Sequence, residues 1–248
     1  MEITSVSNNL VKETVKLQQK KYRTQTKKFL LEGFKAISEA YEAGIELETI
    51  FVEKNHVNKY DFAKNIVIET TEEVLKKLST TESAPSSVAV GIQREYDQNI
   101  LKTSKKVLLL EDIKDLGNLG TIIRSSVAFN ANAIVLYGDS VDIYNPKCVR
   151  ASVGNLWKLP IIHIKDFSKL QELFKDFERI ATLPRANNLL KGFDPKLPSL
   201  IMFGSEANGL SNELINFSTT SVKIEMAKTV ESLNLATSVS IILYEVFS

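Results

Sequence analysis

The 248-residue chain has one cysteine, two histidines, six prolines and no long hydrophobic run. A single cysteine excludes an intramolecular disulfide and is typical of a reducing compartment. No apolar stretch approaches the length of a membrane span, and the start MEITSVSNNLVKE predicts no signal peptide. Because 31 basic and 30 acidic residues leave a formal charge of +1, the whole composition is not that of a polyanion-binding protein. We therefore expect a cytoplasmic protein.

Few residues in the chain could ligate a metal through nitrogen or sulfur. His56 and His163 lie far apart in the sequence and Cys148 stands alone, which is not the spacing of metal ligands, so we predict no metal. Cys148 is expected to be a packed small residue rather than a nucleophile. Trp157 is expected to pack in a core, with stacking on a binding partner as the alternative.

The first part of the chain predicts a small α/β unit. With 44% hydrophobic residues, the chain can build one large core or two ordinary domains. Residues 96–104 are polar and form a candidate linker. Before it, the patterns predict helices over 29–44, which would end at Gly44, and over 71–79, with Thr71 as the N-cap. Short strands are expected over 47–53, 65–70 and 86–93.

Beyond residue 104, short apolar runs alternate with amphipathic stretches. This alternation is typical of a mostly parallel sheet covered by helices on both faces. The apolar runs lie at 106–110, 133–137, 159–164, 179–183, 199–203 and 221–226, and helices are expected over 119–130, 167–177, 211–217 and 233–247. Because parallel α/β sheets bind ligands outside the carboxyl ends of their strands, a site is expected in the loops that follow these runs.

The loop after the first of these runs contains Asn118 and, shortly beyond it, Arg124. The loop is neither a Walker A loop nor GxGxxG, which disfavours a Rossmann-like oxidoreductase. Arg124 lies among apolar residues near the start of a predicted helix, where the helix dipole disfavours positive charge. Either Arg124 has a functional role, or it extends to a neighbouring carboxylate at the surface.

Two later loops also carry polar residues. Glu206 lies between Gly204 and Gly209, and such glycines allow a close approach of the backbone. Glu206 could accept hydrogen bonds from loop amides or pair with an arginine. Ser232 is a good N-cap for the terminal helix, so it could have this structural role instead of a role in a site. Asn234 is less expected in a first helical turn from its propensity.

A basic stretch near the N-terminus, LQQKKYRTQTKKF, has aromatic residues interleaved with its lysines. Such a stretch can hold phosphates by releasing counterions. The alternative is a solvated helix face followed by a loop.

The chain resembles the SpoU family of RNA ribose methyltransferases, which belongs to the SPOUT superfamily. NLGTIIRSSVAF (118–129), MFGSEANGLS (202–211) and IEMAKTVESLNLATSVSIILYE (224–245) resemble its three motifs, in order. NPKCVRASVGNLWKLPI (145–161) matches a stretch between the first two motifs. Residues 1–95 resemble the family's small substrate-binding domain, so the resemblance covers essentially the whole chain.

The resemblance implies a fold and an activity. It implies an RNA substrate-binding α/β domain over 1–95, a linker over 96–104 and a deep trefoil-knot methyltransferase domain over 105–248. It also implies S-adenosylmethionine as cofactor, methyl transfer to a ribose 2′-hydroxyl of RNA, and a homodimer formed through the knot domain and terminal helix. By analogy the substrate is 23S rRNA. The alternatives are a tRNA 2′-O-methyltransferase and a non-catalytic RNA-binding protein of ribosome assembly.

The family's site residues fall on matching positions of this chain. The resemblance implies as catalytic residues Arg124, Asn118, Glu206, Ser232 and Asn234. It implies as cofactor contacts Thr182, Gly204, Ile224, Met226, Ser232 and Leu233. For an RNA substrate, the predicted phosphate contacts are Lys12, Lys16, Lys20, Lys21, Arg23, Lys27, Lys147 and Arg150. Three positions depart from the family pattern. Ala207 and Asn130 replace common glycines, although asparagine still tolerates a left-handed backbone, and Glu225 replaces a common proline.

The resemblance implies that this arginine acts as a base. Because a guanidinium holds its proton beyond about pH 12, we expect Arg124 to activate the ribose hydroxyl by position and charge, with a perturbed arginine acting as a base as the alternative. Asn118, Ser232 and Asn234 are expected to orient Arg124 and the ribose.

Overall fold

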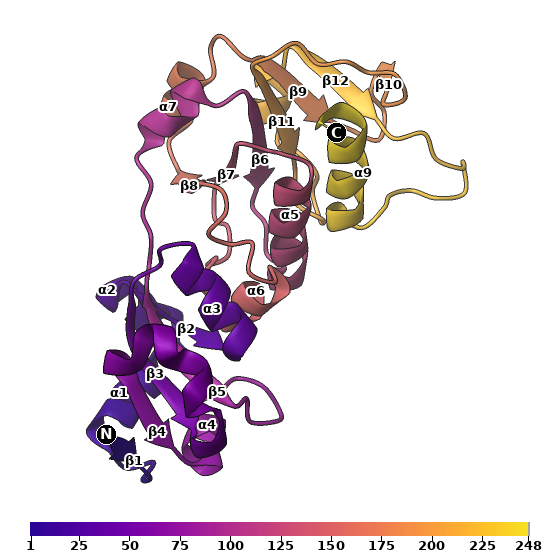
Figure 1. Ribbon diagram of the computed structural model, residues 1–248. Helices are drawn as coiled ribbons and strands as arrows, with labels where there is room; N and C mark the ends of the chain where they lie inside the picture. Colours follow the sequence, from indigo (N-terminus) through magenta and orange to yellow (C-terminus); the bar gives the residue numbers. More distant parts are fainter. Residues whose placement is uncertain (248) are drawn as a thin grey trace. The chain divides into compact units, whose positions relative to one another are not determined.

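A computed structural model describes residues 1–247, which form two compact units (Figure 1). Unit 1 contains Met1–Arg94 and Asp142–Trp157, and unit 2 contains Glu95–Val141 and residues 158–247. The division differs from the one expected at 96–104, because the segment 142–157 belongs to unit 1. The expected linker also contains a short 3₁₀ helix, η2 (Gln98–Thr103), whose Leu101 is buried in the core of unit 2.

Unit 1 is built on a five-stranded mixed sheet in the order β1-β4-β3-β5-β2. Its strands are β1 (Glu2–Ile3), β2 (Lys28–Glu32), β3 (Leu47–Glu53), β4 (Val67–Thr70) and β5 (Ser87–Ile92). Its helical segments are α1 (Asn9–Lys16), α2 (Lys20–Thr26), α3 (Phe34–Glu42), the 3₁₀ segment η1 (Lys54–Ile66), α4 (Glu72–Leu78) and α6 (Pro146–Ala151). Successive residues Ile50, Phe51 and Val52 of β3 are all fully buried, so both faces of the sheet are covered.

The prediction for residues 29–44 was wrong in its first part. Lys28–Glu32 is strand β2, paired antiparallel with β5, and the helix begins only at Phe34. Its expected end is confirmed, since Gly44 follows α3 with a φ of +74°, a conformation that glycine adopts at little cost. The N-cap of α4 is also confirmed, because Thr71 Oγ1 accepts a hydrogen bond from the Val74 amide at 3.4 Å.

Two ion pairs attach the segment 142–157 to the rest of unit 1. Arg23 Nε donates to Asp142 Oδ2 at 2.8 Å, and Arg150 Nη1 donates to Glu32 Oε1 at 3.0 Å. The Arg23 side chain is only 1% exposed, and its Nη1 also donates to the carbonyl oxygens of Leu17 and Gln18. Arg23 is therefore a buried structural residue, and its predicted role as an RNA contact is wrong.

Replacing Arg23 by methionine is expected to destabilise unit 1 by about 3–5 kcal/mol, because Asp142 would lose its partner in a largely buried place. Urea unfolding of the variant measures this loss. The matched control is Lys20→Met, which changes an exposed residue of the same basic stretch and should shift stability by less than about 0.5 kcal/mol. Equal stability of the two variants would contradict the structural role of Arg23.

Unit 2 is built on a seven-stranded sheet in the order β10-β12-β9-β11-β6-β7-β8, in which every strand pairing is parallel. Its strands are β6 (Lys106–Glu111), β7 (Ala133–Tyr137), β8 (Ile161–Ile164), β9 (Glu178–Thr182), β10 (Asn188–Leu189), β11 (Ser199–Phe203) and β12 (Thr220–Lys223). Its longer helices are α5 (Leu116–Ala128), α7 (Phe167–Leu173), α8 (Asn212–Phe217) and α9 (Leu235–Phe247). All six apolar runs expected beyond residue 104 form strands of this one sheet.

Alternating side chains of the strands explain why helices cover both faces of this sheet. Leu109 and Met202 share a buried cluster with Leu170 of α7 and Leu214 of α8. Their neighbours along the strands, such as Leu108, are also fully buried, so they face the other side. On that side α5 and α9 pack side by side (Figure 1). The predicted parallel α/β fold is therefore confirmed, while the knot implied by the resemblance stays a prediction.

No helix within residues 1–247 is long and apolar enough to cross a membrane.

Candidate active site

Three polar side chains from three loops of unit 2 form one hydrogen-bonded chain. Asn234 Nδ2 donates to Asn118 Oδ1 at 3.0 Å, and Asn118 Nδ2 donates to Glu206 Oε1 at 2.7 Å. Asn118 lies in the first turn of α5, Glu206 follows β11, and Asn234 immediately precedes α9. Residues separated by 88 and 116 positions therefore meet beyond the carboxyl ends of the strands, where parallel sheets bind ligands.

The direction of each hydrogen bond in this chain is fixed by the backbone. Asn234 Oδ1 accepts from the Thr237 amide at 3.2 Å, so Asn234 caps α9. That leaves its Nδ2 as the donor, which makes Asn118 Oδ1 an acceptor and Asn118 Nδ2 a donor to the carboxylate. The N-cap of the terminal helix is thus Asn234, and the expectation that Ser232 could fill that place was wrong.

This chain borders a polar cavity of about 760 Å³. The cavity is lined by Asp112, Lys114, Asp115, Asn118, Ser205, Glu206, Ala207, Asn208 and Asn234. Asp115 Oδ1 accepts from the Asn118 amide at 2.6 Å and so caps α5. Asp115 is not among the site residues predicted from the sequence, although an aspartate directly before a helix is a common N-cap signal. Lys114 is held by the Asp139 carboxylate at 2.8 Å, so the unpaired charge around this cavity is negative.

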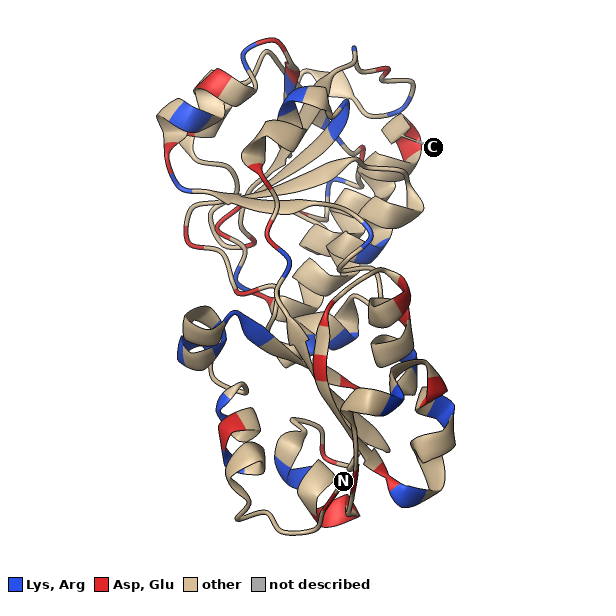
Figure 2. Ribbon diagram, turned by 60° about the vertical axis from the view of Figure 1, so that its left-hand side comes forward, with Lys and Arg blue, Asp and Glu red and all other residues tan. Residues whose placement is uncertain are grey.

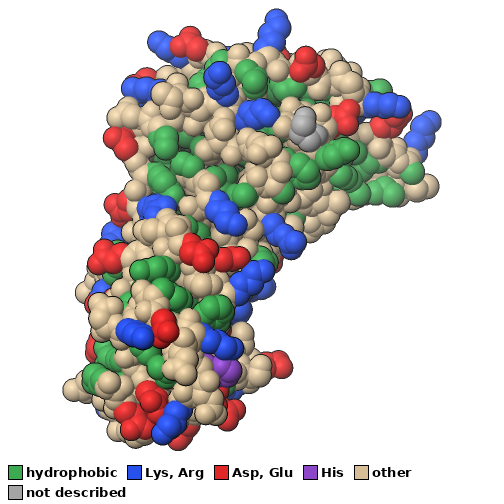
Figure 3. Space-filling model, in the orientation of Figure 1, with side chains coloured by type: hydrophobic (Ala, Val, Ile, Leu, Met, Phe, Trp, Pro, Cys, Tyr) green, Lys and Arg blue, Asp and Glu red, His purple; other side chains and the backbone are tan. Residues whose placement is uncertain are grey.

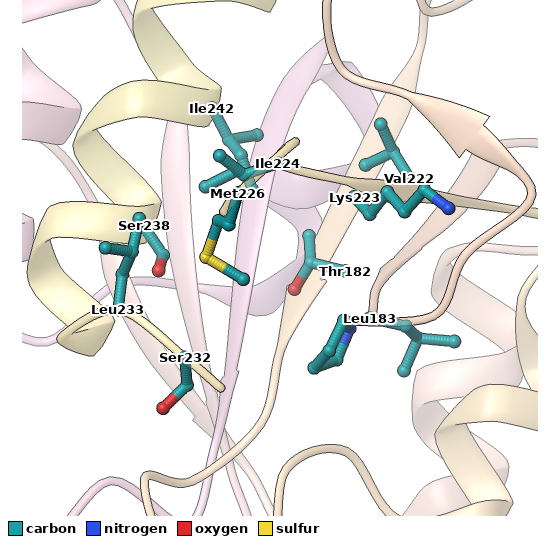
Figure 4. A pocket seen from close by; sticks show the side chains of 11 residues that line it. Thr182, Leu183, Val222, Lys223, Ile224, Met226, Ser232, Leu233, Ser238 and Ile242 are labelled. Atoms are coloured by element: carbon teal, nitrogen blue, oxygen red, sulfur yellow. The ribbon is translucent and has the colours of Figure 1, made fainter. Parts of the chain in front are cut away.

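A second cavity lies beside the first, next to the connection between β12 and α9 (Figure 4). It is lined by Thr182, Leu183, Pro184, Val222, Lys223, Ile224, Met226, Ser232, Leu233, Ser238 and Ile242. Met226, Leu233 and Ser238 lie on one side of it, and Thr182 and Leu183 on the other (Figure 4). Thr182 Oγ1 donates to the Met202 carbonyl oxygen at 2.8 Å, which fixes its orientation.

Five of the six predicted cofactor contacts therefore line one cavity, and the sixth, Gly204, does not. A Cβ atom on Gly204 would lie 1.9 Å from the carbonyl carbon of Gly209 and 2.1 Å from the Leu210 nitrogen. The close approach that Gly204 allows is thus to the chain's own backbone. This approach closes the 205–209 turn, in which the Gly209 amide donates to the Ser205 carbonyl oxygen at 2.9 Å.

Gly204→Ala is expected to destabilise the fold by about 3 kcal/mol or more, because its Cβ would meet backbone that cannot move aside alone. Gly209→Ala is the matched control. Gly209 has a φ of +66° but open space around it, so its cost should be about 1–2 kcal/mol of backbone strain. Thermal unfolding and cofactor calorimetry of both variants give the comparison. If the two changes cost the same, the close approach at Gly204 is not what holds the turn.

The comparisons with known proteins agree with this geometry. The model of the SpoU rRNA Methylase family matches residues 105–244, and that of the MRM3-like substrate binding domain matches residues 8–89. The first match alone covers more than half of the chain. The chain belongs to the SpoU rRNA methylase family.

Three similar proteins cover the chain almost completely. An uncharacterized tRNA/rRNA methyltransferase of Synechocystis is 34% identical over 98% of this chain and 92% of its own length. The 23S rRNA (guanosine(2553)-2′-O)-methyltransferase RlmP of Bacillus subtilis is 28% identical over 98% of each chain. The crystal structure of an AdoMet-bound rRNA methyltransferase from Sinorhizobium meliloti superposes with a TM-score of 0.88 at 28% identity, covering 99% of this chain and 96% of that one. The family is therefore the one that the resemblance predicted, and so is the α/β fold class apart from the knot.

The SpoU arginine, Arg124, lies apart from both cavities. It is exposed on α5, and its side chain makes no hydrogen bond or ion pair within residues 1–247. The expected contacts to Asn118, Ser232, Asn234 and Glu206 are absent from this part of the chain. Within residues 1–247, Arg124 forms no ion pair with Glu206 or with any other carboxylate.

The residues predicted to contact RNA differ in how exposed their side chains are and in the contacts they make. Lysines and arginines mark the ribbon of α1 and α2 in unit 1 (Figure 2). The exposed ones are Lys12, Lys20, Lys21, Lys27 and Lys147. Lys16 is paired with Glu13 at 2.6 Å. Arg150 donates to Thr80 as well as to Glu32, so it contributes to the structure of unit 1.

Cys148 and Trp157 are both buried, as expected of packed residues. Burial raises the pKa of the Cys148 thiol to about 12, so at neutral pH it holds its proton. Asn130 has a φ of +58°, which agrees with its place where the SpoU pattern often has glycine. Among residues 1–247, no three histidine, cysteine, aspartate or glutamate side chains form a group that could hold a metal ion.

Proposed function

We propose that this protein transfers a methyl group from S-adenosylmethionine to the 2′-hydroxyl of a ribose in 23S rRNA. The observation that carries the proposal is the hydrogen-bonded chain Asn234–Asn118–Glu206, which joins the three SpoU motifs beside the cavity lined by the predicted cofactor contacts. The name of the Bacillus subtilis relative supports both the 2′-hydroxyl and 23S rRNA.

The cavity of Figure 4 suits the cofactor chemically. Ile224, Met226 and Leu233 offer apolar surface for an adenine ring, while Thr182 and Ser232 add hydroxyl groups for its polar atoms. When bound, the cofactor would supply an electrophilic methyl group on a sulfonium. Because the sulfur becomes neutral as the methyl group leaves, the protein's main task is to position and activate the ribose hydroxyl.

In this proposal the chain Asn234–Asn118–Glu206 positions the reacting groups and does not take the proton from the ribose hydroxyl. Glu206 Oε1 already accepts a hydrogen bond, and the two amides have fixed donor directions. These bonds hold the 205–209 turn and the start of α9 in fixed positions beside the polar cavity that Asn118, Glu206 and Asn234 line. Activation of the hydroxyl is then assigned to Arg124, whose guanidinium has no partner within residues 1–247 and can hold the hydroxyl and an adjacent phosphate.

The exposed position of Arg124 is consistent with a homodimer. The outer face of α9, which packs beside α5, exposes Ile241 to 38% and Tyr244 to 61%, so α9 offers apolar surface to a second copy. In such a dimer, Arg124 of one protomer would serve the site of its partner. A mixed dimer of Arg124→Ala and Asn118→Asp protomers should then regain up to half of the wild-type activity. If each site uses its own arginine, the mixed dimer keeps no more than the residual activity of the Asn118→Asp variant.

RNA contact by unit 1 is assigned to its exposed lysines, because the active-site cavity is too acidic to attract a phosphate. Lys12, Lys20, Lys21, Lys27 and Lys147 are the proposed phosphate contacts. Changing Lys20 and Lys21 together to alanine should lower the salt dependence of RNA binding by about two in the log–log slope.

The location of the protein in the cytoplasm stays a prediction.

The test of the substrate is methyl transfer from labelled cofactor to purified 23S rRNA, 16S rRNA and tRNA under identical conditions. The proposal predicts label in 23S rRNA, in naked form or in assembling subunits. Label confined to tRNA would reject the rRNA assignment. Tight RNA binding without label in any fraction would favour a non-catalytic assembly protein.

A further inference from the structure

Three cationic side chains gather around a third cavity of unit 2. This cavity, of about 680 Å³, lies between the loop after β9 and the connection from β12 to α9. Arg185, Lys223 and Lys228 line it. It shares Ile224 and Met226 with the cavity of Figure 4, which we call the cofactor cavity. A group bound in it would therefore lie next to the cavity proposed to hold the cofactor.

The three cations are available to a ligand. None of them makes a side-chain hydrogen bond or an ion pair inside the described range 1–247. Two carboxylates, Glu225 and Glu231, also line the cavity, and neither is paired with any of the three. With three cations against two carboxylates, the lining has a net positive charge, which favours an anion.

The cavity also offers apolar surface. Leu189 and Val230 line it and are each 45% exposed. Figure 3 shows hydrophobic side chains along the projecting connection between β12 and α9, and cationic side chains towards its outer end. A ligand that is anionic at one point and apolar beside it fits this lining, as a phosphate followed by a sugar and a base does.

The two cavities that flank the cofactor cavity have opposite charge. The unpaired charges of the cavity beside Asn118 are the carboxylates of Asp112, Asp115 and Glu206, which repel phosphate. A ribose within an RNA strand has a phosphate on each side, and at least one of them must lie close to the site. If Arg124 holds one of these phosphates, the cationic cavity offers positive charge to the other, next to the cofactor cavity.

We propose that the cavity lined by Arg185, Lys223 and Lys228 binds a backbone phosphate of the RNA substrate adjacent to the target ribose. This inference rests on the proposed function. The neighbouring nucleoside lies against Leu189 and Val230. The RNA strand thus enters the site from the edge of the sheet formed by β10 and β12.

A carboxylate could also occupy a cationic cavity, and S-adenosylmethionine has one in its amino-acid part. The experiment separates the two sources with the double variant R185A/K228A, which leaves Lys223 in place because its stem also lines the cofactor cavity. The matched control is K165A/K175A, which removes two exposed lysines of unit 2 that line none of the three cavities.

For R185A/K228A, the KM for RNA is expected to rise roughly tenfold with kcat within about twofold, and the log–log salt slope of RNA binding should fall by about one to two. The cofactor Kd, measured by calorimetry without RNA, should match that of the wild type. An RNA KM and salt slope equal to those of K165A/K175A would overturn the proposal. A weakened cofactor Kd with an unchanged salt slope would assign the cavity to the cofactor carboxylate instead.

Failure of this inference is distinct from failure of the proposed function. If the wild-type protein methylates no RNA, the proposed function fails before any variant is compared. The salt slope of RNA binding still tests the cationic cavity in that case, because it needs no turnover.

Discussion

Arg124→Ala should reduce methyl transfer by about 10²–10³-fold, the cost of removing one preorganised donor from an active site. Because Arg124 is exposed and has no partner within residues 1–247, its removal should change neither the unfolding midpoint nor the cofactor Kd. Single-turnover transfer to 23S rRNA, calorimetry with the cofactor and thermal unfolding measure the three quantities separately.

Two variants make this result specific. Thr121→Ala changes an exposed residue of the same helix and should transfer methyl groups at the wild-type rate. Arg124→Lys keeps the charge but loses the planar fork that can contact a hydroxyl and a phosphate together, so it should recover only part of the activity. A near wild-type rate for Arg124→Ala would remove Arg124 from the mechanism.

Asn118→Asp should lower the rate by roughly 10–100-fold, which corresponds to about 1.4–2.8 kcal/mol, because a hydrogen bond between two site residues turns into a repulsion. The substitution keeps the shape of the side chain but replaces the donor Nδ2 with an oxygen. Two carboxylate oxygens would then face each other at the present 2.7 Å between Asn118 and Glu206. The bond from Asn234 should survive, because its acceptor is still an oxygen.

A second substitution tests whether the direction of this hydrogen bond is what matters. Glu206→Gln alone should be mild, since the glutamine oxygen can still accept from Asn118. In the double variant Asn118→Asp/Glu206→Gln, the glutamine amide can donate to the new carboxylate, so most of the lost rate should return. A double variant as slow as the product of the two single effects would show that the pair acts independently.

The parallel sheet of unit 2 could be predicted because its strands are buried on both faces. Such strands appear in the sequence as continuous apolar runs, as at Leu108–Leu110 and Ile201–Phe203. Strand β2 was missed for the opposite reason. Its apolar residues run directly into the helical pattern of α3, and only its pairing with β5 separates the two elements.

The partners of charged side chains could not be predicted from local patterns. Arg23 is one of several cations in a basic stretch, and its burial depends on Asp142, which lies 119 positions further along. The same long-range pairs place 142–157 in unit 1. Motif order brought Asn118, Glu206 and Asn234 together correctly, but the roles of Asp115 and Asn234 as helix caps depend on where α5 and α9 begin.

The most direct test of the account is the chemical position of the transferred methyl group. Labelled 23S rRNA, digested to nucleosides and separated, should yield a single 2′-O-methylated ribonucleoside, and the linkage next to it should resist alkaline hydrolysis. Label on a base, with the ribose unmodified, would contradict the assignment of this site to ribose methylation.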